Sequence, residues 1–161
     1  MKKILLAAGM IALASGTAHA ATATGSAKAT VVSPLNITHT NGASLNFGTF
    51  TAVTGGQVTL TAAASTTATP TGDVAFVSGN TNSSDSFAVS GDTSRSFNVG
   101  YGGTVNLSNG SATMAFTPTG VASAALTAGA YTLYVGGTLV VGPNQAAGNY
   151  TGTYTVTVTY Q

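Results

Sequence analysis

Few side chains in this sequence of 161 residues can take part in acid–base, nucleophilic or metal chemistry. Beyond residue 20, His39 is the only histidine, Asp73, Asp85 and Asp92 are the only acidic residues, and cysteine does not occur. A serine nucleophile needs a base and an orienting group within reach, and no Gly-x-Ser-x-Gly motif is present. Zinc requires several histidine, cysteine or carboxylate ligands. We therefore expect no enzyme activity, no catalytic residue, no metal and no cofactor, with His39 at a strand end or in a loop.

One group of oxygen-bearing side chains is the best candidate for a cation site. Asp85 and Asp92 follow Asn80 and Asn82 in the sequence, and calcium prefers clustered oxygen ligands. Asp and Asn are also favoured in turns, where their side chains bond to the nearby backbone. We interpret these four residues as turn residues.

The first twenty residues have the form of a secretory signal peptide. Lys2 and Lys3 precede a short apolar stretch at 4–14, and Ala18-His19-Ala20 matches a small-x-small cleavage site. Such a stretch is too short to span a membrane. We expect cleavage after Ala20 and export through the periplasm to the cell surface or an extracellular fibre. The remaining 141 residues are long enough for one domain.

The mature chain carries very little charge. Lys28 and Arg95 stand against three aspartates, which gives a formal net charge of −1. A chain without a basic patch or polybasic segment has no site for nucleic acid phosphates or a membrane surface. We therefore expect no nucleic acid partner and no direct membrane insertion. Because surface charge keeps monomers apart, low charge suits a protein that packs against copies of itself.

Alternating hydrophobicity and turn residues predict an all-β chain. Asn109-Gly110 between apolar alternations is a strong hairpin signal. The only candidate helix, 122–127, is too short, and we expect a loop at 65–72. Regular short strands separated by turns favour a sandwich or a barrel. Strands are expected at 29–38, 57–63, 74–77, 87–89, 97–99, 105–107, 114–116, 133–135 and 139–141, with a compact apolar group at 45–50.

The chain ends in an unbroken alternation from Tyr150 to Tyr160. A period of two puts alternate side chains on opposite faces of a strand, so we expect one long terminal strand. Threonine occupies its polar face. Its apolar face carries Tyr150, Gly152, Tyr154, Val156, Val158 and Tyr160. A terminus of this kind suits an assembly surface.

Two features of this tail resemble the C-terminal signature of chaperone–usher pilins: Tyr160 is the penultimate residue, and Gly148 is the fourteenth from the end. Most of the mature chain also resembles a family of uncharacterised secreted pilin-like proteins. The shared motifs are Val-x-x-Pro-Leu-x-Ile at 31–37, Leu-x-Phe-Gly-Thr at 45–49 and the tail at 135–160. The general form of the tail is similar to that of spore-coat-U-like archaic pilins.

The resemblance implies an immunoglobulin-like β-sandwich of pilin type that is incomplete and is completed by a donor strand. It implies a structural subunit of an extracellular pilus or fimbria, acting in adhesion or biofilm. The implied partners are copies of the chain in a homopolymer, a periplasmic chaperone and an outer-membrane usher. The implied physics is β-augmentation, in which an extended segment adds to an open sheet edge. The domain would cover residues 32–161.

The N-terminal extension, 21–31, is the candidate donor strand. Its apolar face carries Ala21, Ala23, Gly25, Ala27, Ala29 and Val31. An alanine side chain contributes little burial, at about 0.8 kcal/mol per carbon, so ladder hydrogen bonds at a net ~0.5–1.5 kcal/mol each would matter more. The implied assembly strand uses Gly148, Tyr150, Tyr154, Val156, Val158 and Tyr160.

Three alternatives stay open at this point. Residues 21–31 could be an ordinary first strand or a leader of a complete domain. The chain could be a self-contained secreted β-sandwich binding module, with Tyr101, Tyr131 or Tyr134 stacking on sugar rings. Ice binding ranks lower, because a useful plane needs several threonine rows side by side and only the last strand shows a long one.

Overall fold

The computed structural model describes residues 19–161. The expected signal peptide therefore lies outside the described residues, apart from His19 and Ala20. The chain divides after Val31 into two units, Met1–Val31 and Val32–Gln161. Residues 19–31 form no strand, and every one of them is exposed. Residues 19–161 contain no helix, and so none that could cross a membrane; the all-β prediction is confirmed.

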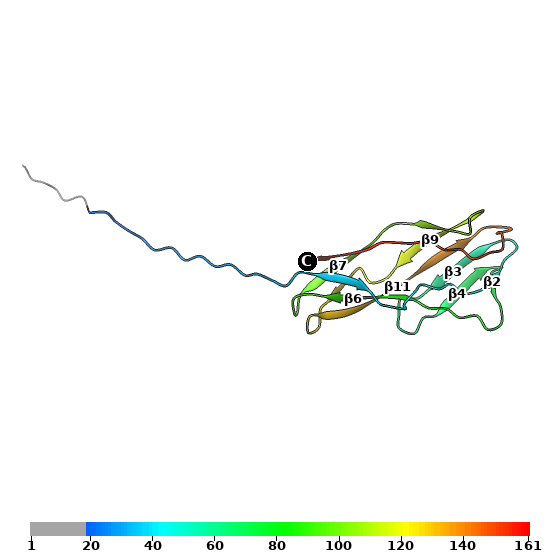
Figure 1. Cartoon of the computed structure of the whole chain (residues 1–161), viewed down its shortest axis with the longest axis horizontal. Coiled ribbons are helices and arrows are strands. Elements are labelled where there is room, and N and C mark those ends of the chain that lie inside the picture. Colours follow the sequence, from blue (N-terminus) through cyan, green and yellow to red (C-terminus); the bar gives the residue numbers. More distant parts are fainter. Residues whose placement is uncertain (1–18) are drawn as a thin grey trace, which may run out of the picture. The chain divides into compact units, whose positions relative to one another are not determined.

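The second unit consists of short antiparallel strands (Figure 1). In the described residues they are β1 (Asn36–His39), β2 (Phe50–Thr51), β3 (Gly56–Leu60), β4 (Ala68–Gly72), β5 (Ala75–Phe76), β6 (Asp85–Ser90), β7 (Ser96–Tyr101), β8 (Val105–Ser108), β9 (Thr113–Thr119), β10 (Ser123–Ala125), β11 (Ala130–Val141) and β12 (Val156–Tyr160). The expected hairpin turn at Asn109-Gly110 joins β8 to β9.

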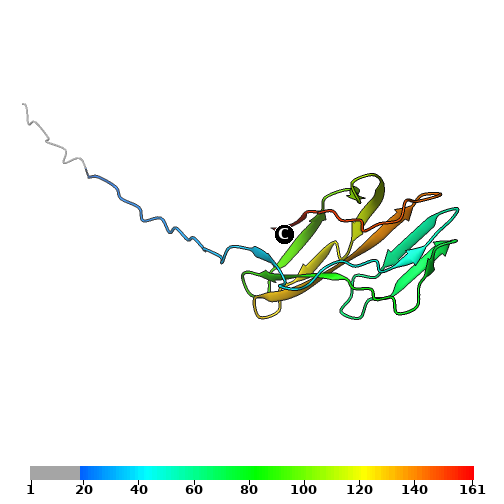
Figure 2. The same cartoon turned by 45° about the vertical axis from the view of Figure 1, so that its right-hand side comes forward.

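Two main sheets pack face to face as a β-sandwich (Figure 2). The larger sheet has the order β1-β6-β11-β3-β4, with β9 paired to β11 and β8 paired to β9. The smaller sheet has the order β10-β7-β12, and β2 pairs with β5 separately. Both views place β2, β3 and β4 at the end of the domain away from the C-terminus. The predicted β-sandwich is confirmed.

The core consists of two clusters of buried side chains. The first lies between the two sheets and buries Val89, Phe97, Leu126, Leu133 and Val135. The second lies among the strands at the other end and buries Phe47, Val58, Leu60, Val74, Met114, Phe116, Leu139 and Val141. Each fully buried side chain of this size contributes roughly 1.5–3 kcal/mol. Tyr154 packs against both clusters and so connects them.

Several predicted strand boundaries are wrong. The strand expected at 29–38 begins only at Asn36, because Pro34 lacks the N–H that a ladder needs. The loop expected at 65–72 contains β4, which tolerates Pro70 because β4 is an edge strand paired only to β3. The buried strand expected at 74–77 is the two-residue β5. The two runs expected around Gly136-Gly137 form one continuous strand, β11.

The long terminal strand is also shorter than predicted. Only Val156–Tyr160 pair with β7, and Thr151 makes an isolated bridge to Ser108. Residues 152–155 form no ladder in the described chain: β7 ends at Tyr101, Gly152 lies beside Asn106 and Leu107 of β8, and the Thr155 carbonyl accepts from the Gly102 N–H. The predicted alternation of faces holds nevertheless. From Thr153 to Tyr160 the threonines are exposed and the residues between them are half-buried.

Candidate functional site

A groove lies between two irregular chain segments of the second unit. It consists of two adjacent cavities of about 620 Å³ and about 510 Å³. Segment 43–52, tied to Ser83 through Asn46, forms one side. Segment 145–154, tied to Ser108 through Thr151, forms the other. The cavities share Leu45, Phe47, Leu107 and Tyr150, and we refer to both cavities together as the groove.

The floor of the groove is apolar, and apolar surface predominates in the 510 Å³ cavity, whereas the 620 Å³ cavity has polar and apolar surface in about equal amounts. The floor comes from the second core cluster and includes Phe47, Met114, Phe116, Leu139 and Val141. Leu45, Leu107, Tyr150 and Tyr154 pack against that cluster but remain half-buried. Half-exposed apolar side chains over a core surface mark a place where a further chain segment would remove more apolar area from water.

Within residues 19–161 the strand that ends at the 510 Å³ cavity, β1, and the strand that follows segment 145–154, β12, each have an unpaired edge. Among the described residues β1 pairs only with β6, and β12 pairs only with β7. Gly152, Thr153 and Tyr154, which lead into β12, make no backbone–backbone hydrogen bond within the described chain. An unpaired edge presents a row of N–H and C=O groups that can bond to an added strand.

The glycine and the first tyrosine of the expected assembly strand lie at the groove. Gly148 is exposed with φ +149, and a Cβ there would lie 2.9 Å from Asn109 Nδ2. This conformation favours glycine. The Tyr150 hydroxyl donates to the Ala146 carbonyl at 2.7 Å and accepts from Gln145 Nε2 at 2.7 Å, which fixes the turn before the terminal segment.

The remaining residues of that strand continue toward the C-terminus. Val156 and Val158 are half-buried against the first core cluster. The Tyr160 hydroxyl accepts from the Asp92 backbone N–H at 2.6 Å and donates to the Ser33 carbonyl at 2.8 Å. The penultimate tyrosine therefore ties β12 to the residues just before β1 and to the turn after β6. The candidate donor residues Ala21, Ala23, Gly25, Ala27, Ala29 and Val31 are all exposed and outside any strand.

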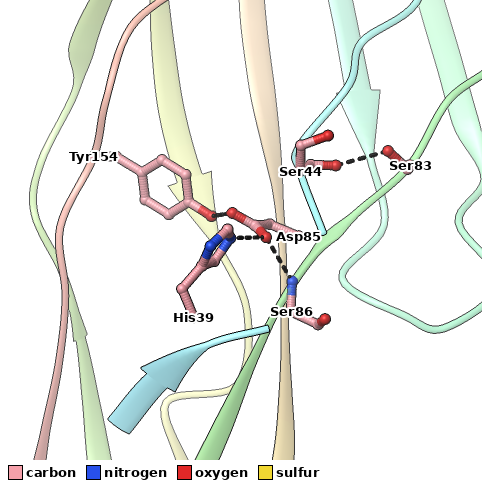
Figure 3. Close-up of polar contacts among 6 residues, drawn as sticks. All are labelled: His39, Ser44, Ser83, Asp85, Ser86 and Tyr154. Carbon is pink, nitrogen blue, oxygen red and sulfur yellow. Dashed lines mark hydrogen bonds and ion pairs between the residues drawn. The ribbon is translucent and has the colours of Figure 1, made fainter. Parts of the chain in front are cut away.

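A buried carboxylate lies at the edge of the 510 Å³ cavity (Figure 3). Asp85 is 5% exposed. Its Oδ1 lies 2.7 Å from His39 Nε2 and accepts from the Ser86 backbone N–H at 2.8 Å, while its Oδ2 accepts from the Tyr154 hydroxyl at 2.7 Å. Figure 3 shows the three side chains converging from three separate segments. Burial raises the pKa of Tyr154, and the hydrogen bond to Asp85 and the charges of Asp85 and Tyr101 add to that effect.

The position of Asp85 corrects the sequence interpretation. We interpreted Asp85 as a turn residue, but it begins β6, and the fold brings it to His39. His39 does lie at a strand end, as predicted. In residues 19–161 the His39 ring has no bonded serine hydroxyl, and the nearby Ser83 hydroxyl donates to the Ser44 carbonyl (Figure 3). The His39–Asp85 pair thus lacks the bonded nucleophile of a hydrolase triad.

The four residues considered for a cation site do not converge. Asn80 and Asn82 bond to each other and to the backbone around Gly48. Asp92 lies 3.8 Å from Arg95. Within the described chain no group of three or more His, Cys, Asp or Glu side chains could hold a metal ion.

The surfaces considered for other ligands have structural partners. The Tyr101 hydroxyl donates to the Val121 carbonyl, and the Tyr131 ring packs edge-on against Phe97. Tyr134 is half-buried in β11. A second arrangement of threonines, which the sequence did not indicate, runs across the large sheet, where threonines of adjacent strands lie side by side. They are Thr69, Thr59, Thr138 and Thr117, with Thr104 beyond. Hydroxyl–hydroxyl bonds within this row stabilise the sheet.

Sequence reasoning missed the groove segment 43–52 and the role of Asp85. A signal for Asp85 was present, since it shares its alternation with Phe87 and Val89 and so belongs on the inner face of β6. His39 likewise shares the alternation of Leu35 and Ile37. No local pattern indicates that segment 43–52, which in the described chain pairs only with β5 and Ser83, lies opposite the C-terminal segment.

Comparison with known proteins gives one match. A family model described as a domain of unknown function, DUF4402, covers residues 35–160. The matched range contains both sides of the groove and the whole of β12. No curated protein and no solved structure shows a significant match to the chain.

Proposed function

The chain belongs to the DUF4402 family, and we propose that it is a structural subunit of an extracellular fibre of the pilus type. In this proposal the subunits join head to tail by strand donation. Residues 21–31 of one subunit enter the groove of the next and pair with the edge of its C-terminal segment. Adhesion or biofilm formation, export by a signal peptide, and a periplasmic chaperone with an outer-membrane usher belong to the same proposal.

One observation carries the proposal: the groove has an apolar floor and lies beside an unpaired backbone. The half-buried Leu45, Leu107 and Tyr150 line it, and residues 152–154 lack backbone partners in the described chain. An added strand bonds to an open edge through its main chain and fills pockets with alternate side chains. The groove and the open edge together offer both kinds of interaction.

The candidate donor has a suitable length and composition. Its eleven residues, 21–31, would extend about 33 Å at ~3.3 Å per residue. The terminal segment from Tyr150 to Tyr160 has the same number of residues. Small alternating side chains let the donor backbone approach the groove closely, so most of its binding free energy would come from ladder hydrogen bonds at a net ~0.5–1.5 kcal/mol each.

The proposal can be tested by placing charged side chains on the apolar face of the candidate donor strand. We would purify the mature chain, residues 21–161, and a variant with Ala23→Asp and Ala27→Asp, which we call the non-donating variant. A carboxylate in an apolar groove is costly, so this variant should remain monomeric while the unmodified chain forms fibres. Size-exclusion chromatography with light scattering and negative-stain electron microscopy measure the difference.

A matched control places the same charge on the other face. The variant with Thr22→Asp and Ser26→Asp carries two added carboxylates at the same spacing, on side chains that would face solvent. It should form fibres like the unmodified chain. If both double variants assemble, or if the mature chain is a stable monomer, strand donation by residues 21–31 is wrong. The monomeric result would favour the alternative, a self-contained secreted binding module.

A further inference from the structure

The Asp85 carboxylate joins the two sides of the groove at one point. His39 stands at the end of β1, where the chain enters the groove side that includes segment 43–52. Tyr154 belongs to the opposite side, in the C-terminal segment. Both bond to the same carboxylate, each at 2.7 Å, and Asp85 itself is 5% exposed and held by the Ser86 N–H.

Few other interactions hold residues 152–154 of the C-terminal side in place. The nearest backbone ties are the Thr151–Ser108 bridge before it and the bond from the Gly102 N–H to the Thr155 carbonyl after it. Between them, the side chain of Tyr154 contacts the domain. Its ring packs edge-on against Phe87 and Phe116, at centroid distances of 6.3 Å and 5.5 Å, and its hydroxyl donates to Asp85.

The cluster is an unusual use of charge in this chain. Asp85 is one of three acidic residues, and in the described chain the only basic side chain bonded to it is His39, whose side chain is half-exposed. A buried carboxylate is costly unless it is well bonded. Here hydrogen bonds from three groups offset that cost, and they also fix the positions of the groups that make them.

We propose that Asp85 is the positioning residue of the groove, holding its two sides, through His39 and Tyr154, at the separation that an added strand requires. Because a hydrogen bond has a narrow range of length and angle, it sets the position of residues 152–154 more closely than ring packing does. This inference rests on the proposed function for the identity of the added strand. The positioning itself can be measured without that strand.

The test compares two hydroxyl deletions. Tyr154→Phe keeps the ring and removes the bond to Asp85. Tyr134→Phe is the matched control, because Tyr134 lies in β11 and lines neither cavity. Both are made in the non-donating variant, which is a full mature chain. The amides of Thr151 and Gly102 donate to the Ser108 and Thr155 carbonyls on either side of Tyr154. Their hydrogen exchange should rise about tenfold in Tyr154→Phe and stay unchanged in Tyr134→Phe, because a bond to a charged acceptor is stronger than a neutral one.

A second readout uses a synthetic peptide with the sequence of residues 21–31. Its affinity should fall about tenfold in Tyr154→Phe relative to Tyr134→Phe. If exchange rises but the unmodified groove does not bind the peptide, the positioning role stands and the fibre proposal fails. If exchange at Thr151 and Gly102 is the same in both variants, the positioning role is wrong whatever the peptide does.

Asp85→Asn provides a variant that retains an acceptor. The Asn oxygen can still accept a hydrogen bond from the Tyr154 hydroxyl, so the amides of Thr151 and Gly102 should exchange more slowly in Asp85→Asn than in Asp85→Ala. Removing the Asp85 charge should also lower the pKa of Tyr154, which an alkaline absorbance titration measures. Equal exchange in the Asn and Ala variants together with an unchanged titration would overturn the inference. If Asp85→Ala does not fold, the Tyr154 titration of Asp85→Asn is compared with that of the unmodified chain, and an unchanged pKa overturns the inference.

Discussion

Enlarging the small side chains of the donor should strengthen binding, and only on one face. Peptides with the sequence of residues 21–31 carry alanine at three central apolar positions, and each alanine fills little of a groove with cavities of about 620 Å³ and about 510 Å³. Ala27→Ile adds three carbon atoms and a β-branched side chain suited to a strand. We expect this peptide to bind more tightly to the non-donating variant.

The size of the gain follows from the apolar area that is buried. Three carbons at about 0.8 kcal/mol each contribute up to about 2.4 kcal/mol, which is up to about 50-fold in affinity at 1.4 kcal/mol per factor of ten. Imperfect fit reduces the gain, so we expect about 10- to 50-fold. The half-buried Leu45, Leu107 and Tyr150 would supply the contacts.

The assay is isothermal titration calorimetry with three peptides. The unmodified peptide sets the reference, Ala27→Ile tests the apolar face, and Thr24→Ile places the same side chain on the polar face. Calorimetry also reports the heat-capacity change, which should be more negative for Ala27→Ile because more apolar surface is buried. If Thr24→Ile gains as much as Ala27→Ile, or if Ala27→Ile gains less than about twofold, the alternation on which donation depends does not exist.

Three predictions concern the domain itself. Tyr160→Phe should lower the free energy of unfolding by about 1–3 kcal/mol, measured by urea denaturation, because it leaves the Asp92 N–H and the Ser33 carbonyl without their bonds; an unchanged midpoint would contradict this. Gly137→Ala should lower the free energy of unfolding by about 2–4 kcal/mol and broaden or abolish cooperative unfolding. Gly137 has φ +155, and an added Cβ would meet the Thr117 carbonyl between β11 and β9. Gly103→Ala, with open space around it, is the neutral control. Hydrogen bonds from Thr54, Val53 and Gly55 lower the pKa of Asp73 from its usual value of 3.8, against a smaller opposing effect of desolvation. The stability that these bonds provide is therefore present above pH 3.8 and is lost as the pH falls through the lowered pKa. NMR spectra should show backbone order at 53–55 decreasing below about pH 3.8. In Asp73→Asn that order should already be reduced at neutral pH.

The Asp85 cluster shows how charge and fold depend on each other in this chain. Asp85 is 46 residues from His39 and 69 residues from Tyr154 in the sequence, and no local pattern links the three. Their convergence was not predicted from sequence. Each nevertheless lies on the inner face of its own segment, as the alternation of its neighbours requires.

The terminal strand illustrates the opposite situation. The alternation from Tyr150 to Tyr160 indicated one long strand, yet only Val156–Tyr160 pair with β7. A side-chain pattern reports which face is buried, and that part of the prediction is confirmed from Thr153 to Tyr160. It does not report whether a partner strand lies alongside. Pairing depends on where β7 ends, which is set by Gly102-Gly103 far away in the sequence.

The all-β class, the faces of most strands and the hairpin at Asn109-Gly110 could be predicted from the sequence, because they depend on period, β-propensity and turn geometry over a few residues. Three features became visible only in the folded chain. Among the described residues β1 and β12 each keep an open edge, segment 43–52 faces the C-terminal segment across a groove with an apolar floor, and Asp85 joins the two sides. These features depend on contacts between residues distant in sequence, and a pattern with a period of two fixes the direction of a side chain but not its neighbour.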